Sequence, residues 1–236
     1  MRVLSLPVLL LMASSAPAMA QVGHPPDQTP YRDLVPGHTF TPMAGYVGGS
    51  GGPLKLGPHA GMVYGARYDF RSNRNLGFAL SVATGKLDRL IVNPFVKLAN
   101  RTSGPVQQRT TFVDLTAQFN VSGGKSWHGL APYIGLSGGI ALSDREPSDT
   151  SGYKFGNKFY VAPQLGVRYF VTSHLNLRAD MRGVFWKLTY PNSFTQEPVE
   201  EPGTADSPNA VRPTGDLSDW TLTPWFQVGL GYVFHW

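Results

Sequence analysis

Seven charged side chains occupy the polar face of segments in which polar and apolar residues alternate. They are four arginines and three aspartates: Arg67, Asp69, Asp114, Arg168, Arg178, Asp180 and Arg182. Enclosed together in a narrow space, such side chains must pair or be hydrated, because an unpaired buried charge costs several kcal/mol. Two functions fit this pattern. One is a gated ion path lined by ion pairs that exchange partners, and the other is a static network that fills an interior and fixes strand register. We favour the static network.

The histidines and serines form no pattern typical of a metal site or a nucleophilic centre. No two of the six histidines lie two or four residues apart, the spacings that place two ligands on one face of a strand or a helix. A serine also needs a base within hydrogen-bond reach to attack at neutral pH. The chain has no cysteine, which excludes disulfides and thiolate metal sites. We therefore expect neither a metal nor another cofactor.

The composition indicates a surface that is only partly in contact with water. Charged residues make up 15% of the chain, well below the roughly 25% usual for soluble domains. The net charge of +5 is spread along the sequence, which gives no basic patch of the kind that binds nucleic acid. The missing surface charge is typical of a protein that faces lipid over part of its area.

Residues 1–20 have the layout of a secretory signal peptide. One positive charge precedes an apolar run over residues 3–12, and the segment ends on Ala18-Met19-Ala20. We expect export with cleavage after Ala20. The apolar run is too short for a membrane-spanning helix, which needs about 20 residues. An exported chain of this kind is either soluble or a membrane barrel.

The elements that must position the charged residues are strands. Alternation with a period of two predicts eight of them, and the last is the clearest, with nine apolar residues on one face between Trp220 and Trp236. The predicted strands are 38–48, 59–71, 76–86, 109–122, 130–143, 158–172, 174–190 and 220–236. In the seventh strand the polar face becomes apolar after Gly183, and we expect a bulge there. Aromatic residues near the strand ends, Phe185, Trp186 and Trp220 among them, are typical of membrane-interface girdles.

The connections between the predicted strands alternate in length. Those after the second, fourth and sixth strands are short, and those after the odd strands are long. A membrane barrel sorts its loops in this way, because odd and even connections emerge on opposite sides. The sheet must also close, because a bilayer tolerates no unpaired strand edge. We predict an all-β fold, an eight-stranded antiparallel up-and-down transmembrane barrel over residues 38–236, preceded by an extended periplasmic lead-in over 21–37.

With these features the chain resembles the small outer-membrane β-barrels of the OmpA/OmpX type. The resemblance rests on the export signal, the eight alternating strands, the sorted loops and the aromatic final strand, and it covers most of 38–236. It implies a location in the bacterial outer membrane. It also implies that the last strand is recognised by the barrel assembly machinery, with Tyr232, Phe234 and Trp236 as the signal. Trp236 stands where this family more often has phenylalanine.

The resemblance implies no catalytic activity. Some small outer-membrane barrels are lipid A deacylases that use a histidine and a serine two residues apart together with a glutamate. None of the histidines here is followed by serine at that spacing, and the four glutamates fall in predicted loops. We therefore expect a protein that is not an enzyme.

Two long loops are the candidate interaction surfaces. The segment 85–109 combines basic residues with an apolar cluster, and Leu90, Ile91, Phe95, Lys97 and Leu98 form a candidate docking surface for the membrane or for a protein partner. The same hairpin could instead simply extend above the membrane. The segment 190–219 is acidic and rich in proline, and we expect it to be extended and mobile. It is either a solvated loop or a site of cation-bridged contact with lipopolysaccharide.

We therefore expect a non-catalytic barrel with a structural or interaction role through its extracellular loops, either standing alone or as a subunit of a larger outer-membrane assembly. Its expected partners are outer-membrane lipids and lipopolysaccharide, the barrel assembly machinery and a protein bound at the loops. Two alternatives remain open at this point. One is a narrow channel for ions or small solutes, and the other is a soluble lipocalin-like carrier, which would have an apolar interior.

Overall fold

The computed structural model describes residues 29–34 and 37–234. The chain divides into two compact units, Met1–Pro30 and Tyr31–Trp236, and the second contains all of the described strands. The predicted signal peptide and its cleavage site lie outside the described residues, as do residues 21–28 of the predicted lead-in.

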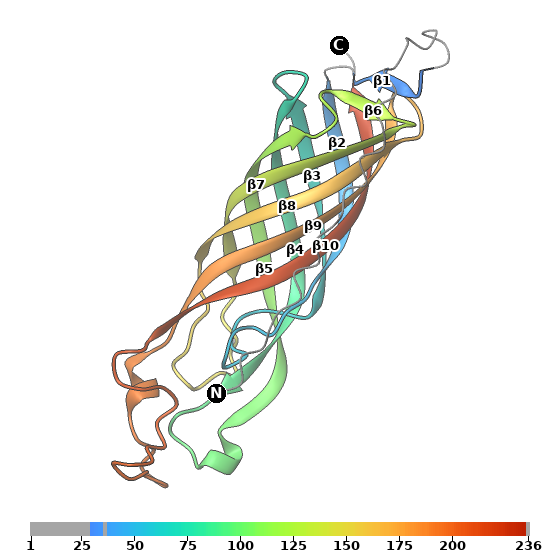
Figure 1. Cartoon of the computed structure of the whole chain (residues 1–236). Coiled ribbons are helices and arrows are strands. Elements are labelled where there is room, and N and C mark those ends of the chain that lie inside the picture. Colours follow the sequence, from blue (N-terminus) through green and yellow to red (C-terminus); the bar gives the residue numbers. More distant parts are fainter. Residues whose placement is uncertain (1–28, 35–36, 235–236) are drawn as a thin grey trace. The chain divides into compact units, whose positions relative to one another are not determined.

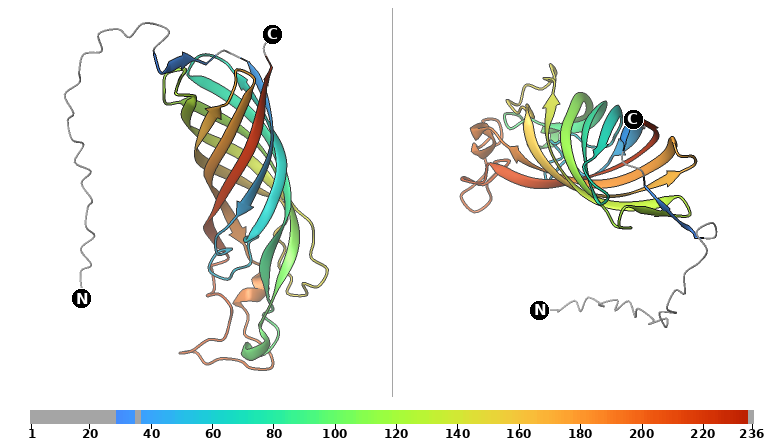
Figure 2. Two further views of the ribbon diagram at one scale, coloured as in Figure 1. Left: turned by 90° about the vertical axis from the view of Figure 1, so that its right-hand side faces the viewer. Right: turned by 90° about the horizontal axis from the view of Figure 1, so that it is seen from above.

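Eight long strands form a closed antiparallel barrel (Figures 1 and 2). Each pairs with the next barrel strand along the chain, and the pairing of the last strand, β10, with the first, β2, closes the ring. This confirms the predicted fold. The barrel strands are β2 (His38–Val47), β3 (Gly61–Arg71), β4 (Leu76–Val92), β5 (Thr102–Asn120), β7 (Leu130–Ser143), β8 (Lys158–Phe170), β9 (Leu175–Thr189) and β10 (Ser218–Phe234).

The connections are sorted by length as the sequence indicates, with one exception. Short turns leave β3, β5 and β8, whereas long loops over residues 48–60, 93–101, 144–157 and 190–217 leave the other strands. The exception is loop 93–101, which has nine residues, as many as the turn 121–129 after β5. The long loops gather at one end of the barrel, the lower end in Figure 1, and the short turns at the other. The long loops contain two short 3₁₀ helices, η1 (Leu98–Asn100) and η2 (Asn192–Thr195).

Two strands are longer than the sequence pattern predicts. β4 continues to Val92 and β5 begins at Thr102, so that most of segment 85–109 is a paired hairpin. The hairpin extends past the neighbouring strands at the long-loop end (Figure 1). The alternation is broken here by an irregularity in the register between Arg89 and Ile91, which explains why a simple period of two misses the extension.

The predicted lead-in contains a short strand. β1 (Tyr31–Asp33) pairs with β6 (Lys125–Trp127), which lies in the turn between β5 and β7. Leu34 follows β1 and is buried. The backbone of this part of the lead-in is therefore paired with the rim of the barrel.

Side chains of opposite character face the two sides of the barrel wall. Large apolar residues from every barrel strand are exposed on the outside, Leu80, Leu115, Leu136, Leu165 and Val228 among them. The inside holds the charged residues. A soluble carrier has the reverse arrangement, so this distribution is that of a barrel in lipid. In the described part of the chain, no helix is long and apolar enough to cross a membrane.

Candidate functional site

The seven charged residues of the polar face all point into the barrel and are buried. They come from β3, β5, β8 and β9, where each occupies an inward position of the alternation. Asp69 lies at the centre of one cluster. It accepts hydrogen bonds from Arg67 Nε at 3.1 Å, Arg178 Nη1 at 3.0 Å and Gln118 Nε2 at 2.9 Å.

Asp114 organises a second cluster beside the first. Arg182 Nη1 donates to Asp114 Oδ2 at 2.9 Å, and the Tyr160 hydroxyl donates to the same oxygen at 2.8 Å. Gln227 on β10 joins the two clusters. Its amide nitrogen donates to Asp180 Oδ2 at 2.9 Å and its oxygen accepts from Arg182 Nη2 at 3.0 Å.

Asp180 completes the link, because its Oδ2 also forms an ion pair with Arg178 Nε at 2.7 Å. The seventh charged residue, Arg168, donates to Asn120 and lies 5.3 Å above the ring of Tyr133. Gly166 leaves the space that this packing needs, because a Cβ atom there would collide with Tyr133 Oη and Asp180 Oδ1. Each carboxylate is thus held by at least one arginine, an arrangement that fixes the side chains.

An aromatic layer lies against this network on the side of the long loops. Trp225 is fully buried, its ring lies 3.6 Å from the Arg182 guanidinium carbon, and Phe112 packs on it with ring centroids 4.8 Å apart. Trp186 stacks on the other side of Phe112 at 6.1 Å. The prediction that Trp186 belongs to an interfacial girdle is wrong, because this side chain is inside the barrel.

The predicted bulge after Gly183 is also absent from β9. The register with β10 is continuous from Leu175 to Thr189, and Val184, Trp186 and Leu188 occupy the inward positions that follow Arg182. The inner face of β9 changes from charged to apolar because the interior itself changes along its length.

The loop 144–157 closes the interior at the long-loop end, on the side of the aromatic layer away from the ion-pair network. Tyr153 and Phe155 are buried, and the Phe155 ring meets Trp186 edge-on at 5.2 Å. Burial raises the pKa of the Tyr153 hydroxyl above its ordinary value. Asp149 anchors the loop through an ion pair with Arg89 of β4, with Nη2 and Oδ2 2.7 Å apart and both side chains 1% exposed.

The acidic loop 190–217 is folded, so the prediction of an extended segment is wrong. The Glu197 carboxylate accepts backbone N–H groups from Gly203 at 2.8 Å, Asn209 at 2.9 Å and Ala210 at 3.1 Å. These bonds, with that from Gly203 foremost, hold the pKa of Glu197 below its usual value. Phe194 is fully buried against the core. One acidic side chain therefore gives the loop a defined shape.

The candidate docking surface is divided by the structure. Ile91 is buried and Leu90 is half-buried, because both lie on the extended part of β4, whereas Phe95, Lys97 and Leu98 are exposed near its tip. The exposed part contacts the acidic loop, since the Leu98 N–H donates to Glu201 at 3.0 Å. The five residues therefore do not form one continuous surface, and Ile91 does not belong to it.

The final strand presents its aromatic residues to the outside. Tyr232 and Phe234 are both exposed on the outward face of β10, beside the β2 strand with which they pair. Trp236 lies outside the described residues. In the closed barrel these two aromatic side chains therefore belong to the outer wall near the short-turn end.

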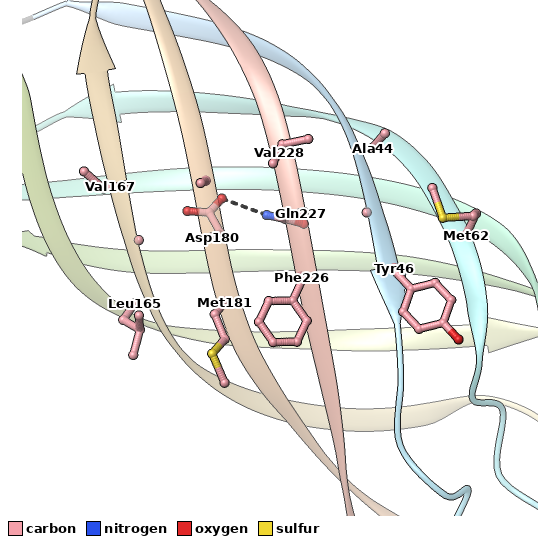
Figure 3. A pocket seen from close by; sticks show the side chains of 13 residues that line it. Ala44, Tyr46, Met62, Leu165, Val167, Asp180, Met181, Phe226, Gln227 and Val228 are labelled. Atoms are coloured by element: carbon pink, nitrogen blue, oxygen red, sulfur yellow. Dashed lines mark hydrogen bonds between the residues drawn. The ribbon is translucent and has the colours of Figure 1, made fainter.

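The outer wall also has an apolar hollow of about 570 Å³ that extends over β8, β9, β10, β2 and β3 (Figure 3). Tyr46, Met181 and Phe226 border it, while the small side chains of Ala44 and Ala179 leave it open. The polar residues at its base, Asp180 and Gln227, are bonded to each other. The hollow faces outward and is of a size that lipid chains fill. Within the described residues, no group of three histidine or acidic side chains could hold a metal ion.

Comparison with known proteins gives the same fold. No family model matches the sequence, and no curated protein matches it. Among solved structures, the outer membrane protein OprG from Pseudomonas aeruginosa is similar with a TM-score of 0.50 and 14% identity, over 88% of this chain and 100% of that one. Neisserial surface protein A has a TM-score of 0.49 and 15% identity, over 87% and 98% of the two chains. The resemblance to small eight-stranded outer-membrane barrels is therefore confirmed at the level of the fold.

Proposed function

We propose that this chain is a non-catalytic integral protein of the bacterial outer membrane, whose barrel holds folded extracellular loops in place for binding. The observation that carries the proposal is the filled interior. The ion-pair network occupies the part nearer the short turns, the aromatic layer follows, and the loop 144–157 packs above it. A barrel closed in this way acts through its outer surface and its loops.

The proposed orientation places the long loops outside the cell and the short turns in the periplasm. Outer-membrane barrels have longer extracellular loops and short periplasmic turns. We further propose that the chain is exported by cleavage after Ala20 and inserted by the barrel assembly machinery through its aromatic final strand. Lipopolysaccharide would then surround the long-loop end, where a partner protein could also dock.

The location has a direct test. After cell fractionation, the protein should be recovered with the outer membrane, and the folded form should run faster on a gel than the boiled form. Both results follow from a closed barrel with an apolar outer belt. Recovery in the soluble periplasmic fraction would contradict the membrane location.

A narrow channel is the second candidate function, and the arginines inside the barrel are the observation that favours it. We expect the purified protein to give no reproducible conductance steps in planar lipid bilayers, because six of the seven buried charges are held in ion pairs and buried aromatic side chains pack against them across the interior. An established porin in the same bilayers is the positive control. Reproducible steps of one size from the wild-type protein would contradict the sealed interior and favour the channel.

A further inference from the structure

Two cations lie directly opposite each other on the outer face of the barrel. Lys86 of β4 pairs in register with Arg109 of β5, and both side chains are exposed. Directly opposite residues in an antiparallel pair have Cβ atoms about 4.5–5.5 Å apart. The two long side chains can therefore reach one common group.

This arrangement is unfavourable by itself. Like charges directly opposite on neighbouring strands destabilise a sheet, and neither cation has an ion pair with any residue in the described ranges. Two acidic side chains are near in register, Asp88 next along β4 and Asp144 beyond Arg109 at the end of β7. The Asp144 backbone N–H donates to the Arg109 carbonyl at 3.1 Å. Neither carboxylate forms an ion pair with Lys86 or Arg109, so the two cationic side chains remain available to an external anion.

The position of the pair identifies the kind of anion. The next outward pair toward the short turns is Thr84 with Thr111, whose hydroxyls are hydrogen-bonded at 3.0 Å. Further toward the short turns come the pairs Val82 with Val113 and Leu80 with Leu115. Of these four residues, Leu80, Val82 and Leu115 are exposed on the outer wall. The cations therefore stand at the edge where the apolar belt ends on the long-loop side. A ligand here meets hydrocarbon on one side and two positive charges on the other.

We propose that Lys86 and Arg109 together bind a phosphate group in the headgroup of a lipid of the outer leaflet. A phosphate accepts charge-assisted hydrogen bonds from both side chains, and the forked guanidinium of Arg109 suits two of its oxygens. The acyl chains of the same lipid lie along the exposed wall formed by Leu80, Val82 and Leu115. The inference rests on the proposed location and adds a defined lipid site to it.

The test measures lipid binding by the whole protein in dodecyl maltoside micelles, using native mass spectrometry. Lipid A with both phosphates is one probe, the same lipid stripped of phosphate is the second, and inorganic phosphate is the third. We expect the wild type to bind the phosphorylated lipid at least tenfold more tightly than the stripped lipid. The double variant Lys86→Gln/Arg109→Gln should lose most of that preference, and Lys125→Gln, an exposed lysine at the short-turn end, should keep it.

Folding of each variant is checked by the shift in gel mobility on boiling. If the double variant fails to fold, Arg109→Glu replaces it, because a glutamate opposite Lys86 makes a favourable cross-strand pair and still removes the phosphate site. Unchanged binding in the folded variants, or equal binding of the two lipids by the wild type, would overturn the proposal. Displacement of the lipid by an equal concentration of inorganic phosphate would overturn the assignment to a lipid. All three results are independent of cell fractionation, which alone tests the membrane location.

Discussion

Replacing Asp69 with alanine will lower the free energy of unfolding by about 3–5 kcal/mol, the cost of breaking a buried ion pair by removing one partner. Asp69 accepts bonds from Arg67, Arg178 and Gln118 inside the barrel. Without it, two buried guanidinium groups lose their shared counter-charge. The measurement is equilibrium unfolding in urea of the protein inserted in phosphocholine vesicles.

The matched control is Asp206→Ala, which removes an aspartate from the surface of loop 190–217, where it is exposed. A surface substitution of this kind changes stability by about 0.5 kcal/mol or less. If the Asp69 variant were as stable as this control, the interior charges would have to be hydrated, and the account of a dry, paired network would be wrong.

Replacing Asp149 with alanine will open the loop 144–157. The variant leaves Arg89 buried without its carboxylate, again a loss of about 3–5 kcal/mol, and removes the oxygen that accepts the Ser151 N–H at 2.9 Å. The middle of the loop then keeps the packing of Tyr153 and Phe155 and a bond between Asn93 and Thr150, but it loses its buried ion pair. The lost ion-pair energy lowers the free energy needed to open this loop locally. The population of molecules with an open loop should therefore rise more than a hundredfold. The measurement is the rate of proteolytic cleavage within the loop on intact vesicles.

Glu146→Ala is the control for this loop. Glu146 lies three residues earlier, and its carboxylate accepts bonds only from Ser148, so removing this side chain should leave the cleavage rate close to that of the wild type. Equal cleavage rates in the Asp149 variant and in this control would show that the ion pair does not hold the loop.

Much of the barrel follows from alternation alone. A period of two sends Arg67 and Asp69 to the same face as Val63, and Arg178 to the same face as Arg182, and the structure has all of them inside. The number of strands and the sorting of loops follow from the same pattern, because a strand with one face in lipid and the other in a packed interior has to alternate. The fold could therefore be predicted without any related sequence.

Alternation cannot tell which of two apolar faces is turned inward. On the inward face of β9, Trp186 and Leu188 follow the charged residues and are apolar. Phe185, on the outward face toward lipid, is apolar too, so at this end of the strand both faces look alike in the sequence. The change from charged to apolar residues after Gly183 therefore resembles a bulge in the sequence, whereas in the structure the interior becomes apolar toward the long loops. The partners within the network were likewise out of reach of the sequence, since Asp69 and Arg178 are 109 residues apart. The folded state of loop 190–217 depends on Glu197, whose three backbone partners no composition rule identifies.

The distribution of the internal network over the ring has a consequence for how the barrel is made. Its members come from β3, β5, β8, β9 and β10, and few of its bonds join neighbouring strands. In an unrolled sheet these charges would face water on an open surface and would gain little from one another. Drying of the interior and neutralisation of its charges therefore coincide with the meeting of β2 and β10. A slip of β3, β5, β8 or β9 by one residue would turn an arginine or an aspartate toward lipid. The side chains that fill the finished barrel therefore also penalise incorrect register of these four strands.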